Sequence, residues 1–217
     1  MDKKQLETEL FDLFARFTSN QLSDKFSSKH EYMDNTKTVL RHTLSECIKR
    51  KWRTHATIWN ICLFIDILAH DLSLLVRDLV LNQENWERRF TARHLALLAY
   101  ECVEDLQTLL GKRFRQSLSK LDLLNEFEPS LGNEKKPLND FWKKHRSSLK
   151  FVRNTTAAHR DHDSLAIWHV IENIDVNYFI SLGMELSTIL NDISSFLQSV
   201  IAKASEIEPP EITSPNS

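Results

Sequence analysis

The scarcity of glycine and proline is the feature that most restricts the folds open to this chain. Only 3 Gly and 5 Pro occur among 217 residues, whereas sandwiches and barrels need turn-forming residues about every 8–12 positions. The chain also lacks the G-x-x-x-x-G-K-[ST] and G-x-G-x-x-G patterns, which excludes a P-loop kinase and a Rossmann dehydrogenase. The composition therefore predicts an all-α fold, and the length suits a single domain.

Apolar residues recur at intervals of three and four along most of the chain, as they do in amphipathic helices. Polar residues at 18–28 and turn-forming residues at 128–137 predict a turn and a loop that reverses the chain. We expect an up-and-down helical bundle of about six to seven helices over 1–204, followed by a disordered tail over 205–217. Its helices are predicted at 3–17, 31–50, 54–81, 84–110, 112–127, 138 into the 150s and 173–203.

Residues 54–81 form the most apolar predicted helix, and we expect it at the centre of the bundle. Its longest apolar run, Ile58 to Ala69, is interrupted by Asn60 and Asp66 and is shorter than the roughly 20 residues of a membrane span. The N-terminus has no apolar segment typical of a signal peptide. These features predict a cytoplasmic protein with no membrane partner, and the three well-separated cysteines are expected to be buried thiols.

Between Asp140 and Asp161 the chain contains no acidic residue but six basic ones. Since the whole chain sums to −2, the remainder carries −8, and the positive charge is strongly segregated. Such a patch attracts a phosphate-bearing partner within about a Debye length, whatever the sign of the whole protein. A solvated helix face explains the same residues without any ligand. The six are Lys143, Lys144, Arg146, Lys150, Arg153 and Arg160.

Arg153, Asn154 and His159 form a short pattern within this basic segment: an arginine, a polar residue and, after four further residues, a histidine. The pattern resembles the motif of the HEPN superfamily, in which arginine is followed by Asn, Asp or His and then, after three to five residues, by His. The resemblance is best from about Trp86 to Ala202, where one long predicted helix precedes the motif and another follows it.

The resemblance implies an HEPN-like core over about 84–203, with the predicted helices of 3–81 packed on it. It also implies a metal-independent endoribonuclease that needs no cofactor and leaves a cyclic phosphate end. In such an enzyme His159 acts as general base or acid, Arg153 binds the phosphate, and Asn154 orients one of them or the phosphate. A neutral imidazole and a guanidinium fork suit these tasks. The basic residues expected to contact RNA are Lys143, Lys144, Arg146, Lys150 and Arg160.

The spacing of Arg153 and His159 limits how their side chains can meet. Six positions at about 100° per residue place them roughly 120° apart on a regular helix. Either the helix is bent, or it ends near Ala158, or a second subunit completes the site, and the resemblance implies a homodimer. Bacterial HEPN proteins commonly act as toxins or antiphage effectors, often restrained by a nucleotidyltransferase-type antitoxin, so the resemblance implies that kind of partner as well.

Two other functions fit the same residues. A non-catalytic HEPN-like module could bind a nucleotide, RNA or a protein partner through the basic segment, and a purely structural bundle could serve dimerisation. In the structural bundle, Arg153, His159 and Arg160 are cations at a helix C-terminus, where the helix dipole favours them. Asp161 or Asp163 then caps the next helix.

Several further residues have both a functional and a structural interpretation. Nine histidines occur, but neither H-E-x-x-H nor E-x-x-H does, so no metal centre is predicted. Asp66 and His70 lie one turn apart on the apolar helix, where we expect a buried hydrogen-bonded pair. Glu101 and Asp105, with Glu104 nearby, form either a solvated stripe or a pair of site carboxylates. Tryptophans that lie near basic residues, and that either stack on bases or pack in the core, are Trp52, Trp142 and Trp168.

Overall fold

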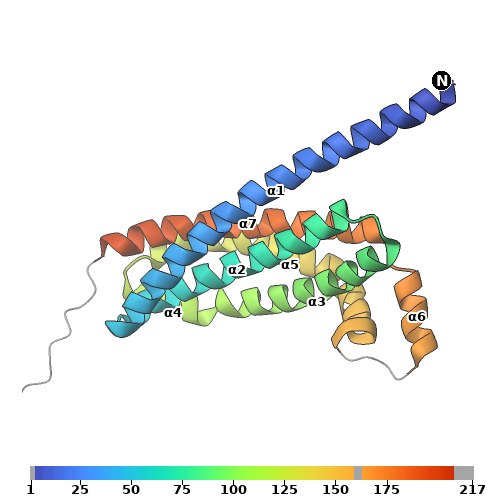
Figure 1. Cartoon of the computed structure of the whole chain (residues 1–217). Coiled ribbons are helices and arrows are strands. Elements are labelled where there is room, and N and C mark those ends of the chain that lie inside the picture. The colour runs from blue at the N-terminus through green and yellow to red at the C-terminus, as the bar shows by residue number, and fades with distance from the viewer. Residues whose placement is uncertain (1–2, 159–162, 208–217) are drawn as a thin grey trace, which may run out of the picture.

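The computed structural model describes the backbone of residues 3–158 and 163–207, and the side chains of 20–156 and 163–207. These residues form an all-α bundle with no strand in the described part of the chain, as predicted (Figure 1). Its elements are α1 (Lys3–Lys49), α2 (Arg53–Leu81), α3 (Asn85–Leu109), α4 (Lys112–Lys120), α5 (Leu124–Val152), the π-helical segment η1 (Arg153–Ala158), α6 (Ser164–Glu172) and α7 (Val176–Glu206).

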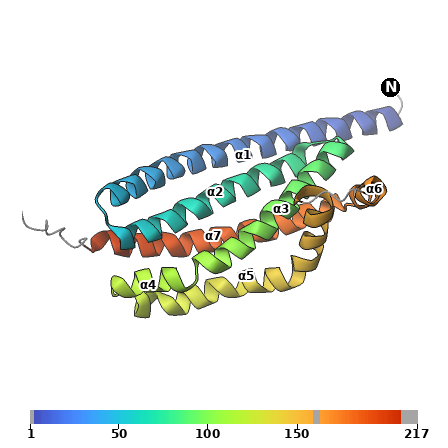
Figure 2. The same ribbon diagram turned by 90° about the horizontal axis from the view of Figure 1, so that it is seen from below.

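The central helix is α2, which contacts α1, α3, α4 and α7. Figure 2 shows it between α1 and α7. Ile58, Leu72 and Leu79 on this helix are almost completely buried, and they belong to one hydrophobic cluster that also draws residues from α1, α3, α4, α5 and α7. By length and composition α2 is the one described helix that could cross a membrane. Many of its apolar residues are buried against neighbouring helices of the bundle, whereas Ile67 and Val80 are exposed.

The predicted turn at 18–28 is wrong, because α1 is one continuous helix through this segment. The segment is polar but contains neither glycine nor proline, so nothing in it prevents helical backbone dihedrals. Ser28 is accommodated in the helix by donating its hydroxyl hydrogen to the carbonyl oxygen of Asp24, at 3.1 Å. Figure 1 shows the N-terminal part of α1 diverging from the other helices.

The predicted loop at 128–137 is also wrong, because α5 runs through it with Pro129 and Pro137 inside the helix. Leu131 and Leu138 are seven positions apart and fully buried, so burial of one helix face offsets the unfavourable prolines. The chain instead reverses just before α5, at residues 121–123, where Asp122 has a positive φ of 58°.

The predicted boundary at Gly111 is confirmed, since α3 ends at Leu109 and α4 begins at Lys112. Gly111 has a φ of −92° and is not left-handed. A Cβ at this position would lie 2.8 Å from the carbonyl oxygen of Thr108. Close backbone approach, rather than a left-handed conformation, therefore requires glycine here.

The C-terminal part of the chain differs from the prediction at helix α6 and at the end of helix α7. Helix α6 is not among the predicted helix ranges, although Asp163 was a predicted helix cap. Asp163 caps α6 by accepting hydrogen bonds from the backbone N–H groups of Leu165 and Ala166 at 2.9 and 3.1 Å. Helix α7 continues to Glu206, so the predicted tail does not begin at 205. The rest of that tail, 208–217, lies outside the described residues.

Candidate functional site

Arg153 and Asn154 lie where α5 changes from α-helical to π-helical geometry. Figure 2 shows α5 bending sharply near its C-terminal end, before the chain reaches α6. Short π-helical segments inside α-helices are frequent at functional sites. The helix is therefore not regular at the motif, which is one of the arrangements that the spacing of Arg153 and His159 predicts.

Three neighbouring groups hold the guanidinium of Arg153. Its Nε donates to Oε1 of Glu101 on α3 at 2.8 Å, and its Nη2 forms an ion pair with the same oxygen. Its Nη1 donates to Oδ1 of Asn154 at 2.9 Å. The guanidinium carbon also lies 4.8 Å from the centre of the Tyr100 ring, in the geometry of a cation–π contact. Arg153 is thus fixed in position before any ligand arrives.

The same guanidinium keeps part of its hydrogen-bonding capacity. An arginine has five N–H donors, and the contacts of Arg153 with Glu101 and Asn154 use three of them. Two donors therefore have no partner among the described residues. The side chain of Arg153 is 22% exposed, so part of it faces solvent. The hydrogen bond from Nη1 of Arg153 to Oδ1 of Asn154 brings two of the three motif residues together.

The contact of Glu101 with Arg153 was not predicted from the sequence. The spacing of carboxylates on α3 suggested a stripe, but nothing in the sequence pointed one of them at Arg153. Glu104 and Asp105 of the same stripe are exposed. Although Asp105 is exposed as a whole, partial desolvation of its carboxylate, together with the charges of Glu101 and Glu104, raises its pKa. Of the three, Glu101 is the one that contacts Arg153.

The predicted basic residues of α5 divide into two groups. Lys143, Arg146 and Lys150 are exposed and follow one another at spacings of three and four, so they form a row on one helix face. Lys144 is paired with Glu185 of α7 at 2.8 Å and has a structural partner. The row remains available to a phosphate backbone, although Lys143 also lies 3.7 Å from Asp140.

Part of the motif segment falls in a gap of the described residues. His159 and Arg160 lie outside the described residues, as does Asp161, one of the two predicted helix caps. Asp163, the other, caps α6 as the structural interpretation expects.

The three tryptophans singled out from the sequence have different surroundings. Trp142 is half-buried and packs edge-on against Tyr100 at 4.9 Å, as a core residue does. Trp52 is half-buried beneath Arg50, 5.0 Å away. Trp168 is 50% exposed and stacks on Trp86 of α3 at 5.7 Å, so it alone of the three offers an exposed ring face.

The expected pair of Asp66 and His70 is not formed. His70 instead accepts a hydrogen bond at Nδ1 from Lys37 of α1 at 2.5 Å and stacks on His30 at 4.8 Å. One carboxylate oxygen of Asp66 is buried with no hydrogen-bond partner among the described residues, and burial raises the pKa of this group. The described residues contain no group of three or more His, Cys, Asp or Glu placed to hold a metal ion.

Burial raises the pKa of all three cysteine thiols, whereas a nucleophilic cysteine usually has a lowered pKa. Cys47, Cys62 and Cys102 are free and buried, as predicted. Burial raises the pKa of both Cys62 and Cys102 to about 12, so these thiols stay protonated at neutral pH and are not nucleophilic.

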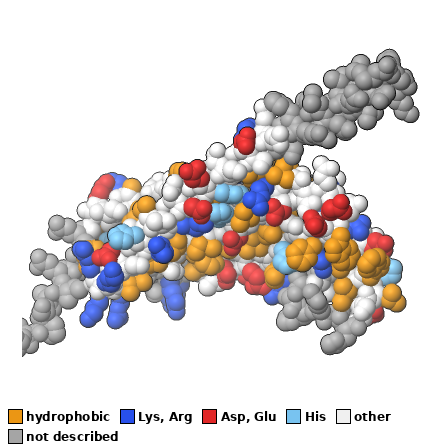
Figure 3. Space-filling model, in the orientation of Figure 1, with side chains coloured by type: hydrophobic (Ala, Val, Ile, Leu, Met, Phe, Trp, Pro, Cys, Tyr) orange, Lys and Arg blue, Asp and Glu red, His pale blue; other side chains and the backbone are white. Residues whose placement is uncertain are grey.

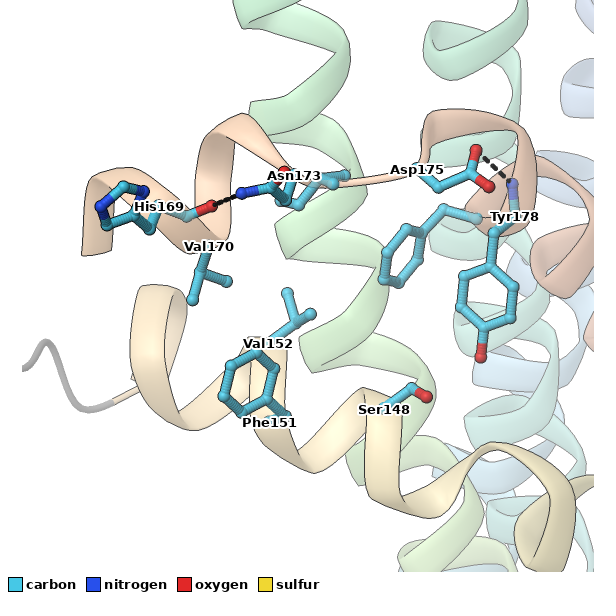
Figure 4. A pocket seen from close by; sticks show the side chains of 10 residues that line it. Ser148, Phe151, Val152, His169, Val170, Asn173, Asp175 and Tyr178 are labelled. Carbon is cyan, nitrogen blue, oxygen red and sulfur yellow. Dashed lines mark hydrogen bonds between the residues drawn. The ribbon is translucent and has the colours of Figure 1, made fainter. Parts of the chain in front are cut away.

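A groove of about 580 Å³ lies beside the end of α5, between that helix, α6 and the start of α7 (Figure 4). Phe151 and Val152, which immediately precede the motif, form part of its wall. None of the predicted site residues in the described part of the chain lines it. The groove and Arg153 therefore use different faces of the same helix end.

Comparison with known proteins gives no relative. No protein-family model, no curated protein and no solved structure matches the chain.

Proposed function

We propose that this protein is a metal-independent endoribonuclease of HEPN type. Arg153 binds the scissile phosphate, Asn154 orients Arg153, and His159 acts as general base or acid. The observation that supports this proposal best is the preorganised guanidinium of Arg153, fixed by Glu101 and Asn154 at a π-helical distortion with two donors to spare. Donors fixed before the reaction stabilise transition-state charge without the cost of reorganisation.

The chemistry needs only groups that this chain supplies. A neutral imidazole at His159 takes the proton of a ribose 2′-hydroxyl, and the 2′-oxygen attacks the adjacent phosphorus. The bond from phosphorus to the 5′-oxygen breaks, and that oxygen takes up a proton from the His159 imidazolium or from water. The products are a 2′,3′-cyclic phosphate and a 5′-hydroxyl. Arg153 donates hydrogen bonds to the non-bridging oxygens, whose negative charge grows during the attack.

The biological setting of the proposal comes from the resemblance. We propose a cytoplasmic homodimer that acts on RNA as a toxin or antiphage effector. A nucleotidyltransferase-type antitoxin is the partner that this setting implies. The row of Lys143, Arg146 and Lys150 is proposed to guide the RNA backbone, with Arg160 as a further contact and Lys144 held by Glu185.

A second candidate is a non-catalytic module that binds RNA through the same surface. The ion pair of Arg153 with Glu101 favours it, because a carboxylate already neutralises the arginine and a phosphate must compete with that charge. The exposed row on α5 would then supply most of the affinity. Such binding falls steeply as salt is raised.

The test is a cleavage assay of the full chain on total RNA and transfer RNA in EDTA. Arg153→Ala and His159→Ala are compared with Arg113→Ala and His42→Ala, which replace exposed residues of the same types elsewhere. We expect EDTA-resistant cleavage, cyclic phosphate ends and a loss of at least about 100-fold in rate for the first two variants only. No cleavage at high enzyme concentration, with salt-sensitive RNA binding, would favour the second candidate.

A further inference from the structure

A chain of aromatic contacts joins Arg153 to a second arginine of α5. The guanidinium carbon of Arg153 lies 4.8 Å from the centre of the Tyr100 ring. That ring meets the ring of Trp142 edge-on, with 4.9 Å between the two centres. The guanidinium carbon of Arg146 lies 5.3 Å from the centre of the Trp142 ring. Both arginines are within the roughly 6 Å of a cation–π contact, so one pair of rings contacts two guanidinium groups.

The two arginines lie on one face of α5. Arg146 and Arg153 follow Trp142 by four and eleven positions, which places all three within about 40° of one another around a helix. Arg153 still has helical dihedrals, with φ −55° and ψ −52°, so the helix is regular between the two arginines. At a rise of about 1.5 Å per residue, they are separated by about 10 Å along the helix axis.

Arg146 has a fixed aromatic neighbour but no charge partner. It is exposed, and no side chain in the described part of the chain forms a hydrogen bond or an ion pair with it. Its contact with Trp142 restricts a side chain that otherwise loses much rotamer entropy when it is ordered. Lys143 and Lys150 on the same helix have no such ring contact among the described residues. Because arginine stays protonated in proteins, Arg146 offers a permanent charge and five N–H donors.

The acidic residues of α3 limit the path that a phosphate chain can take past these arginines. Glu101 contacts Arg153, and Glu104 and Asp105 are exposed further along α3. Figure 3 shows Asp and Glu side chains, in red, near the middle of the molecule over α2 and α3. These carboxylates repel phosphates, whereas the cations of α5 attract them. A path along the exposed face of α5 is therefore favoured over one along α3.

We propose that Arg146 and Arg153 bind two phosphates of the same RNA strand. Trp142 and Tyr100 are positioning residues, which hold the two guanidinium groups at a fixed spacing. The inference rests on the proposed function for its substrate and adds a second phosphate site to it. Arg153 contacts the scissile phosphate, and Arg146 contacts a phosphate about one to three nucleotides away, since a stacked strand advances about 3.4 Å per nucleotide and an extended strand advances more.

The length of the RNA decides whether both arginines are used. Oligouridylates with 2′-O-methyl riboses have no 2′-hydroxyl to attack phosphorus, so they report binding without cleavage. Their Kd for the full chain is measured by fluorescence anisotropy, in a series that grows by one nucleotide at a time. We expect a step of about five- to tenfold in affinity at the length that first spans both arginines, which is the gain from one further charge-assisted contact at an exposed site.

Two substitutions on α5 separate a fixed phosphate site from general attraction. Arg146→Gln should abolish the step and leave the Kd of the shortest oligonucleotides unchanged. Lys143→Gln removes a charge from a neighbouring exposed position and is the matched control. It should lower the affinity by a similar small factor at every length and keep the step.

The positioning role of the ring is tested by a double-mutant cycle. Trp142→Leu should reduce the step by at least about threefold, and it should have no further effect in the Arg146→Gln background, because it acts only through that arginine. Trp142→Phe keeps an aromatic face and should restore part of the step. Circular dichroism checks that each variant is folded.

The inference is overturned if no oligonucleotide binds, or if the affinity rises evenly with length. It is also overturned if Arg146→Gln and Lys143→Gln act alike at all lengths, or if Trp142→Leu weakens binding further in the Arg146→Gln background. A step in a chain that cleaves no RNA would contradict the nuclease function and leave the two phosphate contacts standing. Cleavage without the step would contradict the second phosphate site alone.

Discussion

The contact between Glu101 and Arg153 joins residues that are 52 positions apart in the chain. Arg153, Asn154 and His159 could be singled out from the sequence because they share one short segment. Glu101 and Tyr100 could not be assigned to the same site, since helical periodicity shows which face of a helix is polar but not which helix it meets. The pairing decides the chemistry of the site, because it orients the arginine and also neutralises part of its charge.

Glu101→Gln is expected to separate these two effects. The amide keeps the shape of the side chain but removes the charge that fixes Arg153, so we expect kcat for RNA cleavage to fall about tenfold. KM for RNA should stay the same or fall, because a competing anion is lost. Glu104→Gln, one turn further along the exposed face of α3, is the matched control and should leave both constants unchanged. A rise in KM with unchanged kcat would contradict the positioning role.

Among the secondary-structure elements, the sequence predicted the presence of most helices more accurately than the residues at which they begin and end. The boundary at Gly111 was found because a glycine there has a steric cause. The turn at 18–28 and the loop at 128–137 were wrong because polar or proline-containing composition was given more weight than the burial of one helix face, at Leu131 and Leu138 above all. Helix α6 was missed because nine residues are too few for a clear periodic pattern.

The same substitution should have opposite effects at two helical glycines. A Cβ on Gly132 of α5 would meet no atom within 4 Å, so Gly132→Ala should stabilise the protein by about 0.5–1 kcal/mol. A Cβ on Gly183 of α7 would lie 2.6 Å from a methyl group of Val76 and 3.2 Å from one of Leu95. Gly183→Ala should therefore destabilise it by about 1–3 kcal/mol.

Urea unfolding of both variants and the wild type measures the two free energies. The sign of each change in unfolding free energy is the main readout. The substitution is the same at both positions, so a difference in sign reflects the difference in crowding around the added methyl group. Equal effects at both positions would show that the close crossing of α7 with α2 and α3 is not present in solution.

At the scale of the whole molecule, the all-α class followed from composition and periodicity, but the arrangement of the helices did not. Nothing in the sequence showed that α1 and α2 would meet through a polar cluster as well as an apolar one. In that cluster His30 lies 3.1 Å from the hydroxyl oxygen of Ser73 and stacks on His70. Lys37 donates to His70, which requires that ring nitrogen to be unprotonated.

This cluster should make the stability of the bundle fall in mild acid. Burial, followed by the charges of His70, Arg77 and Lys29, lowers the pKa of His30 below 6.5. The unfolded chain therefore binds a proton at a higher pH than the folded chain does. The contribution of His30 to stability is therefore fully present above about pH 6.5. It is lost as the pH falls through that value toward the lowered pKa of His30.

Thermal or urea unfolding between pH 7.5 and 5.5 checks this dependence. His30→Gln keeps a hydrogen-bonding group toward Ser73 but cannot be protonated, so its loss of stability over this range should be smaller than that of the wild type. His42→Gln, at an exposed position on the same helix, should behave as the wild type does. Identical pH profiles for the wild type and His30→Gln would rule out protonation of His30 as the cause of the loss of stability.

The proposed mechanism requires that the chain cleave RNA through the ribose 2′-hydroxyl without a metal. Its most direct test compares, in EDTA, an RNA oligonucleotide with one mapped cleavage site and the same oligonucleotide with a single 2′-deoxyribose on the 5′ side of the scissile phosphate. We predict that the all-ribose RNA is cut to a cyclic phosphate and that the substituted RNA is not cut at that site. Undiminished cleavage of the substituted RNA, or no cleavage of either, would contradict the mechanism.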